Sequence, residues 1–254
     1  MKRAFSWLIP VVAVVGASVL YFSPNSEQPQ PQAPQVPAPA PPAIRYPIEA
    51  DGPPAEPLPA PAESDGAIRN ALATLFGKDL RKFFNLQDII RRIVATIDNL
   101  PRDNVSLRLL PVKPLPGLLL TMGTGESLAL SLQNSSRYRS YVRLAEAVPT
   151  QAVVAVYRRF YPLFQEQYED LGYPEKYFND RVVEVIDHLL EAPDLHRPVL
   201  LSQPGVLYEF ADPELERLSA GQKILLRMGR ENAVKIKAKL REIREALVSK
   251  VTTG

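Results

Sequence analysis

The chain has 254 residues, a formal net charge of +2 and no cysteine. The absence of cysteine excludes disulfides, thiolate metal ligands, cysteine nucleophiles and the lipid-modified cysteine of a bacterial lipoprotein. Because the net charge is close to zero, no global field favours a nucleic acid, and we expect no nucleic-acid partner. The length suits one or two domains.

Residues 1–22 are predicted to be a transmembrane anchor. Residues 4–22 carry no charge, and as a helix they would span about 28 Å, close to the thickness of a bilayer core. Lys2 and Arg3 precede them, which favours a cytoplasmic N-terminus. We therefore expect a single-pass protein of the bacterial inner membrane whose remaining chain is periplasmic. A signal peptide cleaved after Ser18 is the alternative, and it would also export the chain.

Residues 23–63 are predicted to be a disordered, proline-rich linker. Fourteen of the 26 prolines lie between Pro24 and Pro61, and the stretch has little apolar surface to bury. In polyproline II geometry, at about 3.1 Å per residue, the linker would reach at most roughly 127 Å. It would hold a folded module away from the membrane, toward the cell wall. A role as a ligand of a proline-recognising module is the alternative.

Apolar side chains recur at helical spacing from residue 64 onward. They predict a helix that begins at Ser64 or Asp65 and ends at Gly77, and a second helix over residues 86–99. Alternating leucines around a glycine turn then predict a hairpin over residues 118–132.

Helices follow at residues 134–148 and 150–171, and we expect Pro162 to kink the second of these. The pattern continues with a helix over residues 176–193 and a hairpin or irregular strand over residues 197–210. Asp212 and Ser219 are predicted to cap two short helices before a final helix over residues 231–250. The predicted fold class is therefore mainly α with minor β (α+β). It is a single globular helical domain, residues 64–254, with one or two short hairpins, after a membrane helix and a disordered linker.

No motif in the chain identifies a reaction. The stretch SAGQK at residues 219–223 has one glycine and no hydroxyl residue after its lysine, so it indicates a helix junction rather than a phosphate-binding loop. His188 and His196 lack the spacing of a helical metal site. We therefore expect no cofactor, no metal ligand and no assignable catalytic residue.

Paired carboxylates are the chemistry that an enzyme cleaving peptidoglycan would need. The candidates are Glu166, Glu169, Asp180 and Asp187. However, the four acidic residues from Asp180 to Glu191 have the spacing of one helix face, which favours a solvated surface over catalysis. Acidic residues dominate positions 161–196 and basic residues dominate positions 213–254. We interpret this asymmetry as internal charge balance, the alternative being a surface for an anionic wall polymer.

Aromatic side chains are dense between Tyr157 and Phe178, and we expect most of them in the core. Tyrosines beside arginines also suit stacking on sugars or a protein interface. In the turn at residues 98–102, Arg102 either holds the turn through a carboxylate or carbonyl groups, which we favour, or stays free for an anionic group. The residues that we predict to bind a partner are Arg102, Arg137, Tyr138, Tyr161, Tyr168 and Tyr173.

Four stretches of the chain resemble a known family: DNLPR at residues 98–102, NSSRY at residues 134–138, and long runs at residues 161–193 and 210–244. They are similar to the bacterial family catalogued as domain of unknown function 3014. The resemblance covers essentially all of residues 64–248, and it implies the same architecture of membrane segment, proline-rich spacer and module. No activity is assigned to the family, so the resemblance implies no catalytic residue.

From these patterns we expect a non-enzymatic binding or scaffold module of the cell envelope. Its partners would be the inner membrane, through residues 4–22, and an envelope protein or a cell-wall component. The alternative is a peptidoglycan-modifying hydrolase or lyase that uses a carboxylate as its general acid.

The export prediction is testable with a reporter enzyme that is active only in the periplasm. Fused after Gly254, it should be active, because the positive charges precede the apolar segment. A fusion that lacks residues 1–22 is the control and should be inactive. Activity of only a cytoplasmic reporter at the same position would contradict the topology.

Overall fold

The computed structural model describes residues 43–48 and 61–249. The predicted membrane anchor, residues 1–22, lies outside the described residues, as do residues 23–42 and 49–60 of the predicted linker. The chain divides into two units, residues 1–40 and 41–254, and every described residue belongs to the second. Within the described ranges, no helix combines the length and the apolar character that crossing a bilayer requires.

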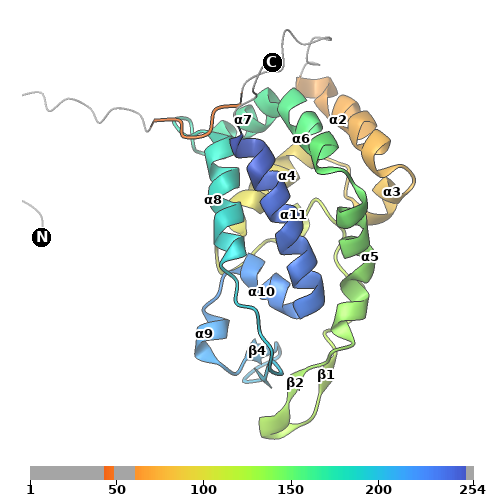
Figure 1. The fold of residues 1–254 in the computed structure, drawn as a ribbon, viewed down its shortest axis with the longest axis vertical. Helices are drawn as coiled ribbons and strands as arrows, with labels where there is room; N and C mark the ends of the chain where they lie inside the picture. The colour runs from red at the N-terminus through yellow and green to blue at the C-terminus, as the bar shows by residue number, and fades with distance from the viewer. Residues whose placement is uncertain (1–42, 49–60, 250–254) are drawn as a thin grey trace, which may run out of the picture. The chain divides into compact units, whose positions relative to one another are not determined.

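The described unit is mainly helical with two short antiparallel hairpins, as the sequence predicts (Figure 1). Its helices are α2 (Pro61–Phe76), α3 (Asp79–Phe83), α4 (Ile89–Asn99), α5 (Asn134–Ala147), α6 (Thr150–Arg159), α7 (Tyr161–Asp170), α8 (Phe178–Leu190), α9 (Pro213–Glu216), α10 (Ala220–Arg227) and α11 (Arg230–Val248), with 3₁₀ turns at Leu107–Leu109 and Gly125–Ser127. Its strands are β1 (Thr121–Met122), β2 (Ala129–Leu130), β3 (Leu201–Ser202) and β4 (Glu209–Phe210).

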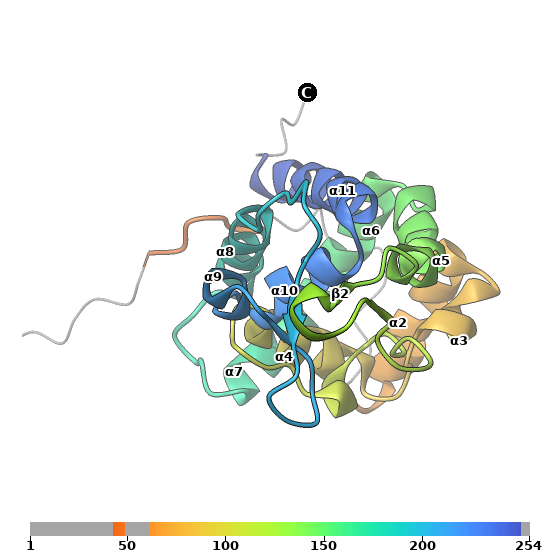
Figure 2. The ribbon, with the colours of Figure 1, turned by 90° about the horizontal axis from the view of Figure 1, so that it is seen from below.

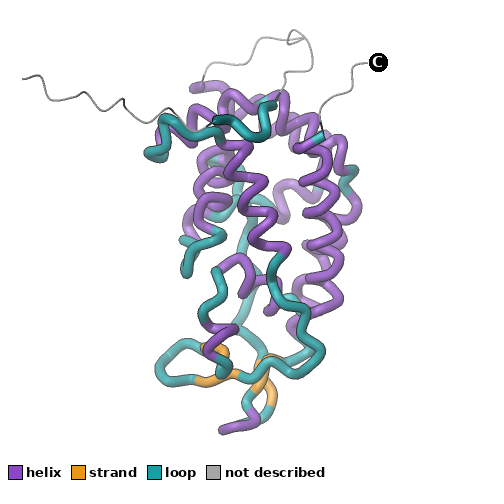
Figure 3. Tube along the Cα trace, turned by 60° about the vertical axis from the view of Figure 1, so that its left-hand side comes forward, coloured by secondary structure: helices purple, strands orange, loops and turns teal. Residues whose placement is uncertain are grey.

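The helix α11 packs against α5, α6, α8 and α10, while α4 packs against α7 and α8. Seen from the end that carries the hairpins, the helices surround α10 (Figure 2). The two hairpins lie together at that end (Figure 3), where a bridge between Ala129 and Leu200 joins them. The strands therefore close one end of a helical core rather than form a sheet of their own.

The largest core cluster lies between α4, α6, α7, α8 and the C-terminal part of α11. Its fully buried aromatic side chains are Phe160, Tyr168 and Phe178, so much of the dense aromatic run is core, as predicted. Each such side chain contributes roughly 1.5–3 kcal/mol through burial. Two smaller clusters lie between α8, α10 and α11 and beneath the hairpins.

The short helix α3 was not predicted, and two of the predicted helix boundaries differ in kind from those in the structure. The expected kink at Pro162 is a break between α6 and α7, because proline at the second position of α7 has no N–H to continue the helix from α6. The first helix begins at Pro61 rather than at a cap on Ser64 or Asp65. The Asp65 carboxylate instead accepts a hydrogen bond from the Asp88 N–H at 2.9 Å.

Residues 43–48, which we call the strap, lie against the N-terminal end of α8. The prediction of a disordered linker over residues 23–63 is wrong for these six residues, as it is for residues 61–63 at the start of α2. The side chains of Tyr46 and Ile48 pack on the largest core cluster, and the N–H groups of the strap reach acceptors on the module. The strap is therefore ordered because it buries apolar surface and pairs its main chain.

The SAGQK stretch is a helix junction, as predicted. Ser219 caps α10 and forms a capping box with Gln222. The N–H groups of Ala220 and Gly221 donate to carbonyl oxygens in the turn after α4, at 2.8 and 2.9 Å. A Cβ at Gly221 would lie 2.5 Å from Leu189 Cδ2 and 3.1 Å from the Leu100 carbonyl oxygen. Glycine is therefore needed here for close approach between α10 and the turn.

Gly221→Ala tests this contact. Overpacking at a close approach costs about 1–3 kcal/mol, so the variant should melt several degrees below the parent protein. Gly66→Ala is the matched control, because a Cβ at Gly66 in α2 meets nothing within 4 Å. That change should leave stability equal or raise it by up to about 1 kcal/mol through helix propensity. Equal melting temperatures for Gly221→Ala and the parent would contradict the packing argument.

Candidate functional site

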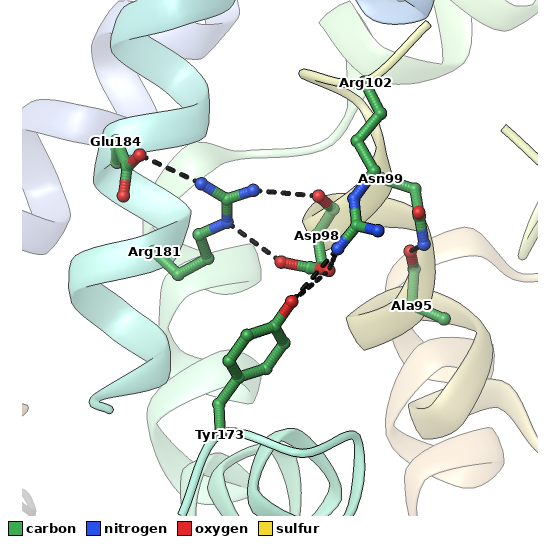
Figure 4. A network of polar contacts seen from close by, with 7 residues as sticks. All are labelled: Ala95, Asp98, Asn99, Arg102, Tyr173, Arg181 and Glu184. Carbon is green, nitrogen blue, oxygen red and sulfur yellow. Dashed lines mark hydrogen bonds and ion pairs between the residues drawn. The ribbon is translucent and has the colours of Figure 1, made fainter. Parts of the chain in front are cut away.

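The carboxylate of Asp98, at the C-terminal end of α4, is the most buried charge beside a pocket in the described part of the chain. The residue is 2% exposed. Its Oδ1 accepts from Arg181 Nε at 3.1 Å, and its Oδ2 accepts from Arg102 Nη2 at 2.6 Å and from the Tyr173 hydroxyl at 3.3 Å (Figure 4). Both oxygens are thus satisfied by donors from separate segments of the chain.

Arg181, in the first turns of α8, donates three hydrogen bonds in this network. Its Nη2 also donates to the main-chain carbonyl of Asp98 at 2.9 Å, and its Nη1 donates to Glu184 Oε1 at 2.9 Å. The guanidinium therefore binds the end of α4 through both side chain and main chain, and it joins α4 to α8.

Arg102 and Tyr173 complete the network on its solvent side. Arg102 Nη2 donates to the Tyr173 hydroxyl at 3.0 Å, and the negative charge of Asp98 raises the pKa of Arg102. The Tyr173 ring stacks on the Tyr168 ring with 4.7 Å between centroids. Burial raises the pKa of the Tyr168 hydroxyl to about 12. Tyr173 is thus fixed at both its ring and its hydroxyl.

The turn at residues 98–102 has the structural character that we favoured. Arg102 binds a carboxylate, and Asn99 Nδ2 donates to the Ala95 carbonyl at 2.6 Å (Figure 4). Asp98 also accepts from Arg181 and Tyr173, which are side chains of other segments. The turn is therefore held by tertiary contacts more than by local ones.

A pocket of about 430 Å³ opens beside this network. Its walls are the strap residues Ala43 and Arg45, the Asp98 network, the loop between α7 and α8, and the first turns of α8. The volume falls in the range of small-ligand sites, which is about 300–1,000 Å³.

The carboxylates that line the pocket are already bonded. Asp98 binds two arginines, Asp180 accepts two N–H groups of the strap, and Glu184 binds Arg181. The cations of Arg45 and Lys176 also line the pocket, and neither forms an ion pair within the described ranges. The Lys176 ammonium lies 5.0 Å from the centre of the Tyr173 ring. The groups that remain open are thus cationic and aromatic.

The structure brings together three of the six residues that we predicted to bind a partner. Arg102, Tyr168 and Tyr173 lie in or beside the Asp98 network, and the two tyrosines line the pocket. Tyr161 is buried in the core, where its hydroxyl donates to Gln165 at 3.0 Å. Partner binding by this set stays a prediction.

Arg137 and Tyr138 lie on α5, away from the pocket. The Arg137 guanidinium donates to the main-chain carbonyls of residues 116–118 at 2.7–3.1 Å and to Asn134 Oδ1. It therefore fastens the loop before β1. Tyr138 packs against the cluster of α8, α10 and α11, and burial raises its pKa.

The acidic candidates for catalysis do not converge on one cleft. Glu166 is exposed on α7, and Glu169 accepts from Gln165 Nε2 at 2.8 Å. Asp187 pairs with Arg244 of α11, and the buried Lys237 pairs with Asp194 at 3.0 Å. These two pairs join the acidic and basic stretches of the sequence, which supports internal charge balance. Within the described ranges, no group of acidic and histidine residues could hold a metal ion.

Sequence reasoning missed Arg45, Lys176 and Arg181 as pocket residues. For Arg45 a signal was present, since Arg45 and Tyr46 are the only basic and the only aromatic residue within residues 23–63. For Arg181 no local signal exists, because its partner Asp98 is 83 residues away in sequence.

Comparison with known family models assigns the chain to a family. The family model described as "Protein of unknown function (DUF3014)" matches residues 89–244, more than half of the chain. The chain belongs to this family, as the resemblance of its motifs implies. The match contains the whole Asp98 network, whereas the strap lies outside it. Neither the curated proteins nor the solved structures gave a match.

The network predicts a graded loss of stability on mutation. Arg102→Ala removes the bonds to Asp98 and Tyr173 made by a side chain that is 53% exposed, so the expected cost is about 1 kcal/mol. Arg181→Ala leaves the Asp98 carboxylate buried without its α8 partner, and the expected cost is about 3 kcal/mol. Arg143→Ala, at an exposed position of α5, is the control and should unfold like the parent protein.

Chemical denaturation of the three variants measures these costs. If Arg181→Ala unfolded no earlier than Arg143→Ala, the network would not be structural. If Arg102→Ala kept full stability but lost partner capture in cells, the turn would be a binding site instead.

Proposed function

We propose that this protein is a membrane-tethered binding module of the cell envelope, without catalytic activity, whose pocket beside Asp98 takes an anionic group of a cell-wall component. The tether and the periplasmic location rest on the charge pattern around residues 4–22. The proposal of a ligand in the pocket is based on the contacts of the described residues.

One observation carries the choice of an anionic ligand. The three carboxylates of the pocket are bonded to arginines or to N–H groups, while Arg45 and Lys176 line the same pocket without a carboxylate partner among the described residues. An incoming carboxylate or phosphate would pair with these two cations, and the fixed Tyr173 ring beside them offers a stacking surface. Carboxylates occur in the peptide stems of peptidoglycan, which the proposed compartment contains.

The same contacts weigh against the hydrolase or lyase alternative. A general acid must hold a proton near neutral pH, which requires a carboxyl group in a desolvated site without cationic partners. Asp98 is buried, but both of its oxygens already accept hydrogen bonds from the two arginines and Tyr173, so neither faces a substrate unpaired. Asp180 accepts an N–H group of the strap at each of its two oxygens. The pocket thus suits binding better than proton transfer.

Purified cell-wall sacculi provide the test. The full-length protein in detergent should sediment with sacculi and release no soluble fragments from them. Lys176→Glu should lower the bound fraction at least fivefold, because it removes a pocket cation and adds a repelling charge. Lys78→Glu makes the same charge change at an exposed position outside the pocket, and it should bind like the parent protein.

The outcomes separate the two functions. Release of soluble wall fragments would support the enzymatic alternative. Equal binding by Lys176→Glu and Lys78→Glu would show that the pocket is not the binding site. Loss of binding in both variants would indicate attraction by charge over the whole surface.

A further inference from the structure

The hydrogen bonds that hold the strap to the start of α8 all use the main chain of the strap. The Asp180 carboxylate accepts from the N–H groups of Arg45 at 2.9 Å and Tyr46 at 2.7 Å. The Asn179 side-chain amide donates to the Tyr46 carbonyl at 2.9 Å. Bonds of this kind recognise an extended chain whatever its side chains are, as in the binding of a peptide strand.

The spacing of the bonded groups explains why a proline fits in this segment. The Tyr177 hydroxyl accepts from the Ile48 N–H at 2.7 Å, so the bonded N–H groups belong to residues 45, 46 and 48. Pro47 falls at the one position between them where no N–H is needed. Its ring fixes φ and lowers the entropy lost on docking. The arrangement suits a tyrosine–proline–apolar segment.

The side of α8 that receives the strap is built for such a chain. Asn179 is fully buried, its Oδ1 accepts from the Tyr157 hydroxyl at 3.2 Å, and its N–H donates to the Tyr161 hydroxyl at 3.2 Å. These bonds fix its amide so that Nδ2 faces the strap. Without a chain in place, this buried donor would lose its carbonyl partner, which is unfavourable.

The docked strap is nevertheless shallow. Ala43, Ile44, Arg45 and Pro47 are exposed, and only Tyr46 and Ile48 are partly covered. Because Ala43 and Arg45 line the pocket, departure of the strap would remove one wall of the pocket and one of its two open cations.

We propose that residues 177–180 form a binding site for an extended tyrosine–proline–apolar peptide, and that the strap is its releasable intramolecular occupant. Docking of the strap completes the wall of the pocket, and release opens it. This inference goes beyond the proposed function and stands on the strap contacts alone, whatever ligand the pocket takes.

Trypsin reports the docking directly, because Arg45 is the only basic residue between Arg3 and Arg69. Cleavage after Arg45 breaks the bond whose N–H is held by Asp180, and it requires the strap to leave α8. In the full-length protein in detergent, this cleavage should be at least tenfold slower than in a synthetic peptide of residues 40–52.

Asp180→Asn should raise the cleavage rate at least fivefold, because its NH₂ group would face the N–H donors of the strap. Glu191→Gln removes the same charge at the other end of α8 and should cleave at the parent rate. Tyr46→Ala, which lies outside the helices, should also cleave faster. This second variant keeps the proposal testable if Asp180→Asn does not fold, which a melting curve of Asp180→Asn would show.

A capped peptide Ala-Ile-Gln-Tyr-Pro-Ile, which lacks a trypsin site, tests release and exchange. The effective concentration of a tethered segment is roughly millimolar, so about 10 mM peptide should accelerate cleavage at Arg45. The proposal is overturned by any of three results: parent cleavage as fast as in the synthetic peptide, parent-like rates for both Asp180→Asn and Tyr46→Ala, or no effect of the competing peptide. Binding of the Asp180→Asn and Tyr46→Ala variants to sacculi tests the proposed function and does not bear on strap docking.

Discussion

The arrangement of this module depends on one buried charge, the carboxylate of Asp98. It lies at the end of α4, the helix that carries much of the largest core cluster, and its burial is costly unless cationic donors surround it. Those donors come from α8, from the turn after α4 and from the loop between α7 and α8. An ion pair of this kind need not be more stable than apolar packing. Its effect is to raise the free energy of arrangements in which Arg181 is displaced from Asp98. Because both residues line the pocket, the same ion pair fixes the pocket walls.

The turn after α4 meets a second constraint from α10. Two N–H groups at the start of α10, which a helix leaves unpaired, donate to the carbonyls of Leu100 and Arg102. The two short motifs at residues 98–102 and 219–222 therefore form one junction, although more than a hundred residues separate them. Gly221 permits the junction because it brings no side chain into the gap.

Local features of the module could be predicted from the sequence, and long-range ones could not. Apolar periodicity and caps such as Ser219 are read from neighbouring residues, so the longer helices and the first hairpin were predicted, while the second was predicted as a hairpin or an irregular strand and α3 was missed. A kink was predicted at Pro162, and the structure has a break between two helices there. The pairing of Asp98 with Arg181 has no local signature. The strap was missed because composition was averaged over the whole linker, which concealed Tyr46.

The distance along the chain between the strap and its receptor has a consequence during synthesis. Tyr46 and Asp180 are 134 residues apart. At about 5–20 residues per second, Asp180 is added to the growing chain roughly 7–27 s after Tyr46. Until then the strap has no α8 to dock on, so once it leaves the ribosome its tyrosine and isoleucine stay exposed to chaperones. The ribosome thus releases this segment long before the fold can shelter it.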